Sequence, residues 1–127
     1  MRLPVNAWFA IAALDGALAV IAGAFAAHGL RGQLSAAALE VFQTGARYQM
    51  YHALAMALAA LVMRGESVAR ARLAAALFLI GSVLFCGSLY SLALSGLRGF
   101  GVVTPFGGLA FIGGWIALAA AGLKLKA

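Results

Sequence analysis

The chain has 127 residues, of which 65% are hydrophobic and only 9% are charged, and its formal net charge is +6. A soluble domain of this length exposes too much surface to hide so many apolar residues, and a disordered chain needs low hydrophobicity with high charge. The composition therefore predicts an all-α integral membrane protein, since one transmembrane helix takes about 20 apolar residues and the chain has room for about four.

The first predicted span covers residues 6–27, with Trp8 near its start as an anchor at the membrane surface. A signal peptide is the competing interpretation, because Arg2 precedes the apolar run and the triplet from Ala24 to Ala26 resembles a cleavage site. The run is longer than the roughly 7–15 apolar residues of a signal peptide, which favours a retained transmembrane helix.

Between Ser35 and Arg64 the chain has no helix-breaking glycine–proline pair, but its two halves differ in polarity. Residues 35–49 put apolar side chains on one helical face and polar ones on the other. This pattern predicts a short amphipathic helix at the membrane surface, or an extension of the span that follows. The second span itself is predicted over residues 46–63.

Two further spans are predicted over residues 73–94 and 104–123, with a turn-rich segment at 95–99 between them. Thr104 and Pro105 suit the start of the last helix, because proline is tolerated in a first helical turn. We therefore predict a bundle of four transmembrane helices, with residues 1–127 forming a single membrane domain.

Basic residues in short loops predict the orientation of the bundle. With four spans, both termini and the middle loop share one side of the membrane, and the basic residues of that side are Arg2, Arg64, Arg70, Arg72, Lys124 and Lys126. The other side carries only Arg31, Arg47 and Arg98. This asymmetry predicts that both termini lie in the cytoplasm.

Burial of apolar surface does not drive helices together in lipid, so small residues that allow close packing have to hold the bundle. Two spans carry such residues at helical spacing: Ala12, Gly16, Ala19, Gly23 and Ala27 in the first, and Gly113, Ala117 and Ala121, flanked by Gly107 and Gly114, in the fourth. The pattern predicts a compact bundle. It leaves open whether some of these faces bind a homo-oligomer or another membrane-protein partner.

Asp15 lies near the middle of the first span, where an acidic residue costs roughly 2.5–3.5 kcal/mol to insert. Such a residue needs a bonding partner or a functional role. His52 and Ser82 lie at a similar depth in the second and third spans, and an Asp15–His52 hydrogen bond is the first hypothesis. The group is interpreted either as a proton relay or polar substrate site, or as a buried tie that fixes helix register.

A second polar group is predicted toward the outer side of the membrane. Its members are His28, Glu40, Gln43, Arg47 and Gln49. It is interpreted either as a site for a headgroup, a peptide or an ion, or as the solvated face of an interfacial helix. Glu40 and Arg47 are seven residues apart, which puts them on one helix face but beyond ordinary direct reach.

The chain carries no nucleophile-elbow, zinc-binding or phosphate-loop motif. Its single cysteine, Cys86, excludes a multi-cysteine metal site, and two distant histidines are weak support for a metal. We therefore expect a non-enzymatic protein with no metal and no cofactor. The basic residues are few and scattered among apolar segments, so we expect the lipid bilayer and no nucleic acid as a partner.

Four segments in chain order resemble the family catalogued as domain of unknown function 423. They are residues 23–30 (GAFAAHGL), 42–56 (FQTGARYQMYHALAM), 87–92 (GSLYSL) and 104–115 (TPFGGLAFIGGW). The resemblance implies a small four-helix protein of the bacterial inner membrane without an assigned reaction. It also points to motif positions at His28, Arg47, Tyr48, Gln49, His52, Ser88, Tyr90, Thr104, Pro105 and Gly107.

Most of these motif positions are expected in the outer half of the membrane, where the start of the last helix at Thr104 attracts anions. We therefore predict an outward-facing polar pocket with Arg47 as its cation, surrounded by His28, Glu40, Gln49, Ser88, Tyr90 and Thr104. The predicted function is binding of a lipid or small partner, or membership of a larger assembly. The alternative is a small oligomeric transporter or channel that uses Asp15 and His52 as intramembrane polar groups.

Overall fold

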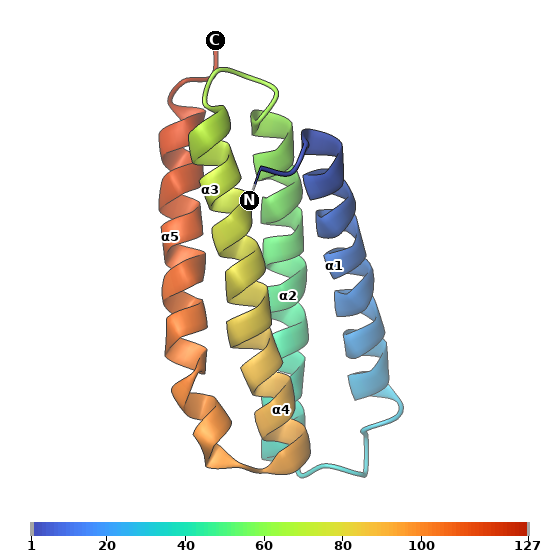
Figure 1. Ribbon diagram of the computed structural model, residues 1–127. Helices are drawn as coiled ribbons and strands as arrows, with labels where there is room; N and C mark the ends of the chain where they lie inside the picture. Colours follow the sequence, from blue (N-terminus) through green and yellow to red (C-terminus); the bar gives the residue numbers. More distant parts are fainter. Residues whose placement is uncertain (1, 127) are drawn as a thin grey trace.

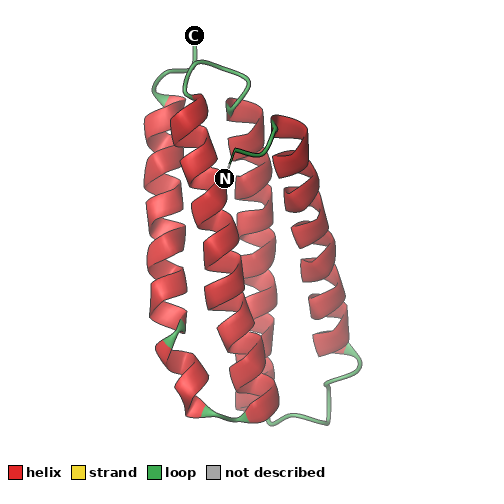
Figure 2. Cartoon of the chain, in the orientation of Figure 1, coloured by secondary structure: helices red, strands yellow, loops and turns green. Residues whose placement is uncertain are grey.

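The computed structural model describes residues 2–126, and these form helices joined by short loops, without a β-strand (Figures 1 and 2). The elements in chain order are α1 (Val5–Ala27), α2 (Ala36–Val62), α3 (Val68–Gly81), the π-helical turn η1 (Ser82–Cys86), α4 (Gly87–Ser95), the 3₁₀ turn η2 (Arg98–Val102) and α5 (Thr104–Gly122). Because η1 joins α3 to α4 without a break, these three elements make one continuous rod.

Three helical segments are long and apolar enough to cross a membrane: Val5–Ala27, Val68–Ser95 and Arg98–Gly122. They correspond to the first, third and fourth predicted spans, although the third begins earlier, at Val68 instead of residue 73. α2 is not one of the three, because Arg47, Gln49 and His52 lower the mean hydropathy of even its more apolar second half.

The short amphipathic helix expected before the second span is wrong as a separate element. α2 is unbroken and begins at Ala36 instead of residue 46, with the Ser35 Oγ accepting a hydrogen bond from the backbone N–H of Ala38 at 3.1 Å. Gly45 lies inside this helix, and the ring of Tyr90 packs against it: a Cβ there would lie 2.8 Å from that ring. The polar residues of 35–49 are therefore the first turns of α2.

The helices pack in an open zigzag, and Figure 1 shows α1, α2, α3 and α5 side by side in that order. α2 and α3 make the central pair, α1 packs along α2, and α5 packs along α3. α1 has little contact with the α3–α4 rod, and α2 has little contact with α5. Two grooves result, one between α1 and α3–α4 and the other between α2 and α5.

The core is built from alanines packed around a few large side chains, of which Trp8, Met56 and Phe78 are fully buried. Trp8 is therefore not the surface anchor expected from the sequence, because small residues of the neighbouring helices leave room for its indole ring inside the bundle. On α1 the small-residue face buries Ala12 and Ala19, whereas a Cβ at Gly23 would meet nothing within 4 Å.

At Gly107, α5 packs closely against the α3–α4 rod. A Cβ at this position would lie 2.3 Å from the backbone nitrogen of Phe85, a group that cannot rotate away. The face that α5 buries consists of Gly107, Phe111, Gly114, Ala117 and Ala121. It therefore includes most of the predicted small-residue stripe, but with Gly114 in place of Gly113.

Candidate functional site

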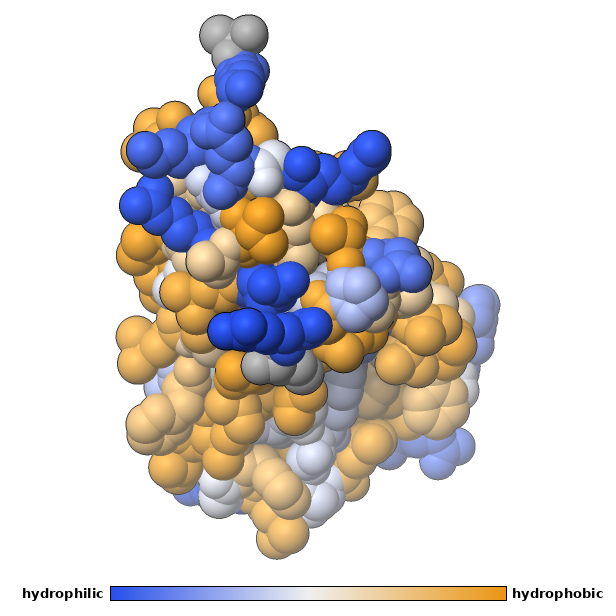
Figure 3. Space-filling view, turned by 45° about the horizontal axis from the view of Figure 1, so that its top comes forward, coloured by the Kyte–Doolittle hydropathy of each residue, from blue (hydrophilic) through white to orange (hydrophobic). Residues whose placement is uncertain are grey.

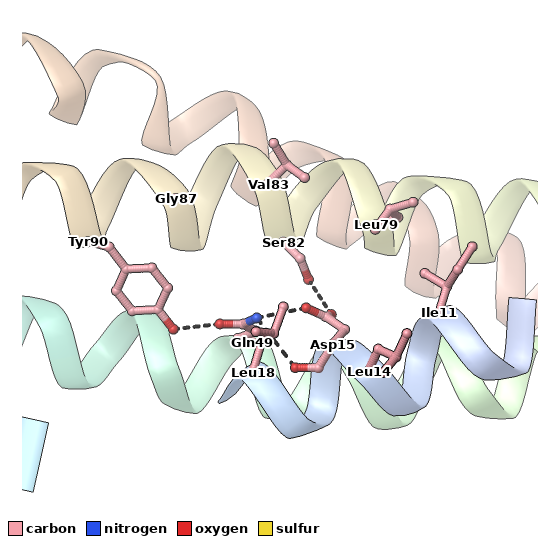
Figure 4. Close-up of a pocket in the computed structure, with 10 residues that line it drawn as sticks. All are labelled: Ile11, Leu14, Asp15, Leu18, Gln49, Leu79, Ser82, Val83, Gly87 and Tyr90. Atoms are coloured by element: carbon pink, nitrogen blue, oxygen red, sulfur yellow. Dashed lines mark hydrogen bonds between the residues drawn. The ribbon is translucent and has the colours of Figure 1, made fainter. Parts of the chain in front are cut away.

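A polar cluster joins α1, α2 and the α3–α4 rod close to the middle of each. Asp15, Gln49 and Ser82 are its central members, and each is more than nine-tenths buried. The Gln49 Nε2 donates a hydrogen bond to the Asp15 Oδ1 at 2.8 Å, and the Ser82 hydroxyl donates to the Asp15 Oδ2 at 3.1 Å. Asp15 is thus held by neutral donors from two other helices (Figure 4).

Tyr90 extends this cluster by one further bond. Its hydroxyl donates to the Gln49 Oε1 at 2.6 Å, so Gln49 accepts from Tyr90 while it donates to Asp15. The ring of Tyr90 lies over Gly45, where the missing side chain lets α4 approach α2. The sequence hypothesis placed Gln49 and Tyr90 in an outer pocket, whereas the structure joins them to Asp15 in the middle of the bundle.

The π-helical turn explains how Ser82 and Tyr90 reach the same cluster. They are eight residues apart, which in a regular α-helix puts them about 80° apart around the axis. A π turn accommodates one extra residue, so the effective separation falls to about 20° and both side chains face α1 and α2. Nothing in the sequence pattern indicates this turn.

The groove between α1 and the α3–α4 rod opens directly onto the polar cluster. Its volume is about 390 Å³, and Figure 4 shows Asp15, Gln49 and Ser82 at its base. The walls are apolar and the open side is flanked by exposed side chains, among them Leu14, Leu18 and Val83. We call this feature the Asp15 groove.

The expected Asp15–His52 hydrogen bond is wrong. Asp15 bonds to Gln49 and Ser82, while the His52 Nδ1 lies 2.7 Å from the carbonyl oxygen of Tyr48 on the preceding turn. The His52 Nε2 accepts a bond from the Trp115 indole N–H at 3.1 Å. Since Nε2 is the acceptor, Nδ1 carries the proton and donates to Tyr48, which fits a neutral imidazole.

His52 lies in the second groove, between α2 and α5, which has a volume of about 470 Å³. Its imidazole stacks on the ring of Phe111, with centroids 3.4 Å apart and planes 9° from parallel. Asp15 and His52 therefore line different grooves, and no hydrogen bond within residues 2–126 joins them.

The residues predicted to surround Arg47 do not form one pocket, because they make separate contacts. The Arg47 Nη2 lies 2.6 Å from the Glu40 Oε1 and 3.3 Å from the Thr44 Oγ1, on an exposed face of α2. Glu40 is thus within direct reach of Arg47, contrary to expectation, because the arginine side chain extends back along the helix. Arg47 does not join Tyr90, which bonds to Gln49 instead.

Two further residues of the predicted pocket, Ser88 and Thr104, bond to each other. The hydroxyl groups of Ser88 and Thr104 are 2.6 Å apart and join α4 to the start of α5. His28 follows the last turn of α1 and is exposed to solvent. Across residues 2–126, the acidic, histidine and cysteine side chains form no group of three that could hold a metal ion.

Comparison with known proteins gives one consistent family. The model of the family described as protein of unknown function (DUF423) matches residues 22–108. A UPF0382 membrane protein of Haemophilus influenzae is 43% identical over 122 residues, which covers 95% of this chain and 97% of that protein. No solved structure matches the chain.

Two further relatives come from well-separated bacteria. The UPF0382 membrane protein YwdK of Bacillus subtilis is 41% identical over 115 residues and covers 90% of this chain and 94% of that protein. The UPF0382 inner membrane protein YgdD of Escherichia coli is 39% identical over 115 residues and covers 91% of this chain and 88% of that protein. Since the family model matches most of the chain and the relatives align over nearly all of it, the chain is a small membrane protein of the DUF423 family.

Proposed function

We propose that the chain is a four-span protein of the bacterial inner membrane, in which α2 crosses the membrane in addition to α1, the α3–α4 rod and α5. A helix of 27 residues is about 40 Å long, which exceeds the roughly 30 Å of a bilayer's hydrocarbon core. Gln49 and His52, the polar side chains near its middle, are both bonded within the protein. Arg47 extends toward Glu40 at the end of the helix, as a snorkelling side chain does.

The proposed orientation has both termini in the cytoplasm. The two termini and the α2–α3 loop share one end of the bundle (Figure 1). Hydrophilic side chains gather at that end above apolar flanks, as Figure 3 shows. The exposed basic residues Arg64, Arg70, Lys124 and Lys126 are on or beside this end, which supports a cytoplasmic location by the positive-inside rule.

We further propose that the protein is a binding protein and not an enzyme, and that the Asp15 groove is where it binds a lipid-like amphiphile. The observation that carries this proposal is a groove with apolar walls whose base holds a buried, hydrogen-bonded carboxylate at mid-bundle. An intramembrane ionisable side chain beside a cavity is typical of a ligand site. The alkyl chain of such a molecule packs against the apolar walls, and its polar group lies at the base of the groove beside Asp15.

The test uses a neutral probe, hexadecanol carrying a photoreactive diazirine, with the protein reconstituted in nanodiscs. The groove is expected to be labelled saturably, so that excess unlabelled hexadecanol suppresses labelling of the helical segments around Asp15 and Ser82. Gly87 lines the groove and a Cβ there meets nothing within 4 Å, so Gly87→Leu fills the groove without disturbing the polar cluster. This variant should lower labelling at least about tenfold.

Gly23→Leu is the matched control, because a Cβ at Gly23 also meets nothing within 4 Å and this glycine does not line the groove. It should leave labelling unchanged. Labelling that spreads evenly over the lipid-facing surface, or that is the same in both leucine variants, would show that the groove does not bind an amphiphile.

A further inference from the structure

We propose that the ligand of the Asp15 groove is a hydrophobic amine, whose ammonium group pairs with the Asp15 carboxylate. This inference rests on the proposed function, because it names the chemical class of the amphiphile that the groove binds. It follows from the charge balance of the site and from the hydrogen-bonding capacity that the cluster leaves open.

The charge balance comes first. Asp15 is 8% exposed, and the groups that donate to its carboxylate, the amide of Gln49 and the hydroxyl of Ser82, are both neutral. Within residues 2–126, the ion pairs are Arg47 with Glu40 and Lys126 with Glu66, so no basic side chain compensates Asp15. A buried carboxylate without a cation is costly, and a ligand that brings a positive charge removes that cost.

The hydrogen-bonding capacity points the same way. A carboxylate has about four acceptor positions, and the side-chain bonds from Gln49 and Ser82 use one on each oxygen. An ammonium group carries only donors, so it matches the remaining acceptor positions of Asp15. A hydroxyl group matches them without supplying charge, and a fatty-acid carboxylate is repelled by Asp15.

The walls of the groove specify the rest of the ligand. Leu14 and Leu18 of α1 and Leu79 and Val83 of the α3–α4 rod line the groove together with Asp15 (Figure 4). These walls offer no charged group to a ligand, so an alkyl or aryl chain extends from the ammonium toward the surrounding lipid. Small hydrophilic amines lack such a chain and are not expected to bind.

The experiment compares two probes that differ only in their polar group: hexadecylamine and hexadecanol, each carrying the same diazirine. Labelling of the lipid-facing side of α5 corrects for the different amounts of each probe in the bilayer. The wild-type groove is expected to favour the amine over the alcohol at least about tenfold, because the ammonium group brings a positive charge to the Asp15 carboxylate and the hydroxyl group does not.

Asp15→Asn keeps the size of the side chain and removes its charge, so it should lower the ratio of amine to alcohol labelling at least about tenfold, to about one. If this variant does not fold, the preference of the wild-type protein is itself the test, with Gly87→Leu as the variant that blocks both probes.

The outcomes separate the two proposals. Equal labelling of the groove by amine and alcohol overturns the amine inference and leaves the proposed amphiphile site standing. Absence of saturable groove labelling by either probe, as when a second copy of the chain covers the groove, overturns both. A preference for the amine that persists in Asp15→Asn also overturns the inference, because the charge of Asp15 is then not its cause.

Discussion

Gln49 holds the polar cluster together at the scale of single residues, because it donates to Asp15 and accepts from Tyr90. Its side chain therefore connects Asp15 on α1 to Tyr90 on α4. Removing it leaves a buried carboxylate oxygen and a tyrosine hydroxyl each with one partner fewer.

We predict that Gln49→Leu lowers the free energy of unfolding by about 1–3 kcal/mol, because a buried acceptor and a buried donor lose their partner. Tyr90→Phe should cost less, about 0.6 kcal/mol, the usual value of an interhelical hydrogen bond in a membrane. Reversible unfolding in mixed micelles with increasing sodium dodecyl sulfate measures both. Gln43→Leu, the same change elsewhere on α2, is the control.

The double variant tests whether the two residues act through one bond. In a Gln49→Leu background, Tyr90→Phe should cost almost nothing, since the bond it removes is already lost. Strict additivity of the two costs would contradict the cluster as described.

Depth along a helix could be predicted from the sequence, whereas the side to which a residue turns could not. Counting residues puts Asp15, His52 and Ser82 at similar depth, yet only Ser82 faces Asp15. The face of α2 that carries Gln49 depends on where that helix begins and on which neighbour packs beside it. Tyr90 joins the cluster only because Gly45 and the π turn bring its ring there.

At the scale of helices, the close approach between α5 and the α3–α4 rod depends on glycine. The Phe85 backbone occupies the space that a side chain at Gly107 would need. Backbone atoms inside a helix cannot move aside without shifting the whole element, so this contact fixes the spacing of the two helices.

We predict that Gly107→Ala lowers the free energy of unfolding by about 1–3 kcal/mol, the cost of overpacking a tight core position. Gly23→Ala is the matched control and should leave stability unchanged or slightly raise it, because its Cβ meets nothing within 4 Å. The same micelle titration measures both. An equal effect of the two alanines would show that α5 does not depend on contact at Gly107.

The ends of a helix can be predicted from hydropathy where an apolar run stops at a polar loop. Apolar runs ending in polar loops predict α1 and α5 closely, at Val5–Ala27 and Thr104–Gly122. Hydropathy leaves open whether residues 35–49 form a separate amphipathic helix or extend the second span, because the polar first turns of α2 differ in composition from the rest, and the structure shows the extension. The zigzag packing, and with it the groove, depends on contacts between helices that no single segment encodes.

At the scale of the whole molecule, the basic residues at the end that holds both termini bond to other parts of the chain and also indicate its orientation in the membrane. The Arg70 side chain donates to the carbonyl oxygen of Ala120 at 3.3 Å, and Arg72 donates to that of Leu3 at 3.3 Å. These bonds tie the start of α3 to the end of α5 and to the segment before α1. Lys126 pairs with Glu66 at 3.2 Å, between two exposed side chains. The exposed Arg64 and Lys124 are the better reporters of orientation alone.

We predict that a green fluorescent protein fused to the C-terminus fluoresces, and that alkaline phosphatase at the same position is inactive, because the proposed orientation puts both termini in the cytoplasm. Alkaline phosphatase inserted at Gly99, in the segment between α4 and α5, should be active, since in the proposed four-span topology three spans precede that segment and one follows it, which puts it on the side opposite to both termini. Replacing Arg64 and Lys124 by glutamine should weaken this asymmetry without breaking the bonds of Arg70 and Arg72. A C-terminal phosphatase that is active together with an inactive one at Gly99 would contradict this topology, because either the orientation is then reversed or α2 does not cross the membrane. Activity at both positions would instead mean that α5, the helix between Gly99 and the C-terminus, does not cross the membrane.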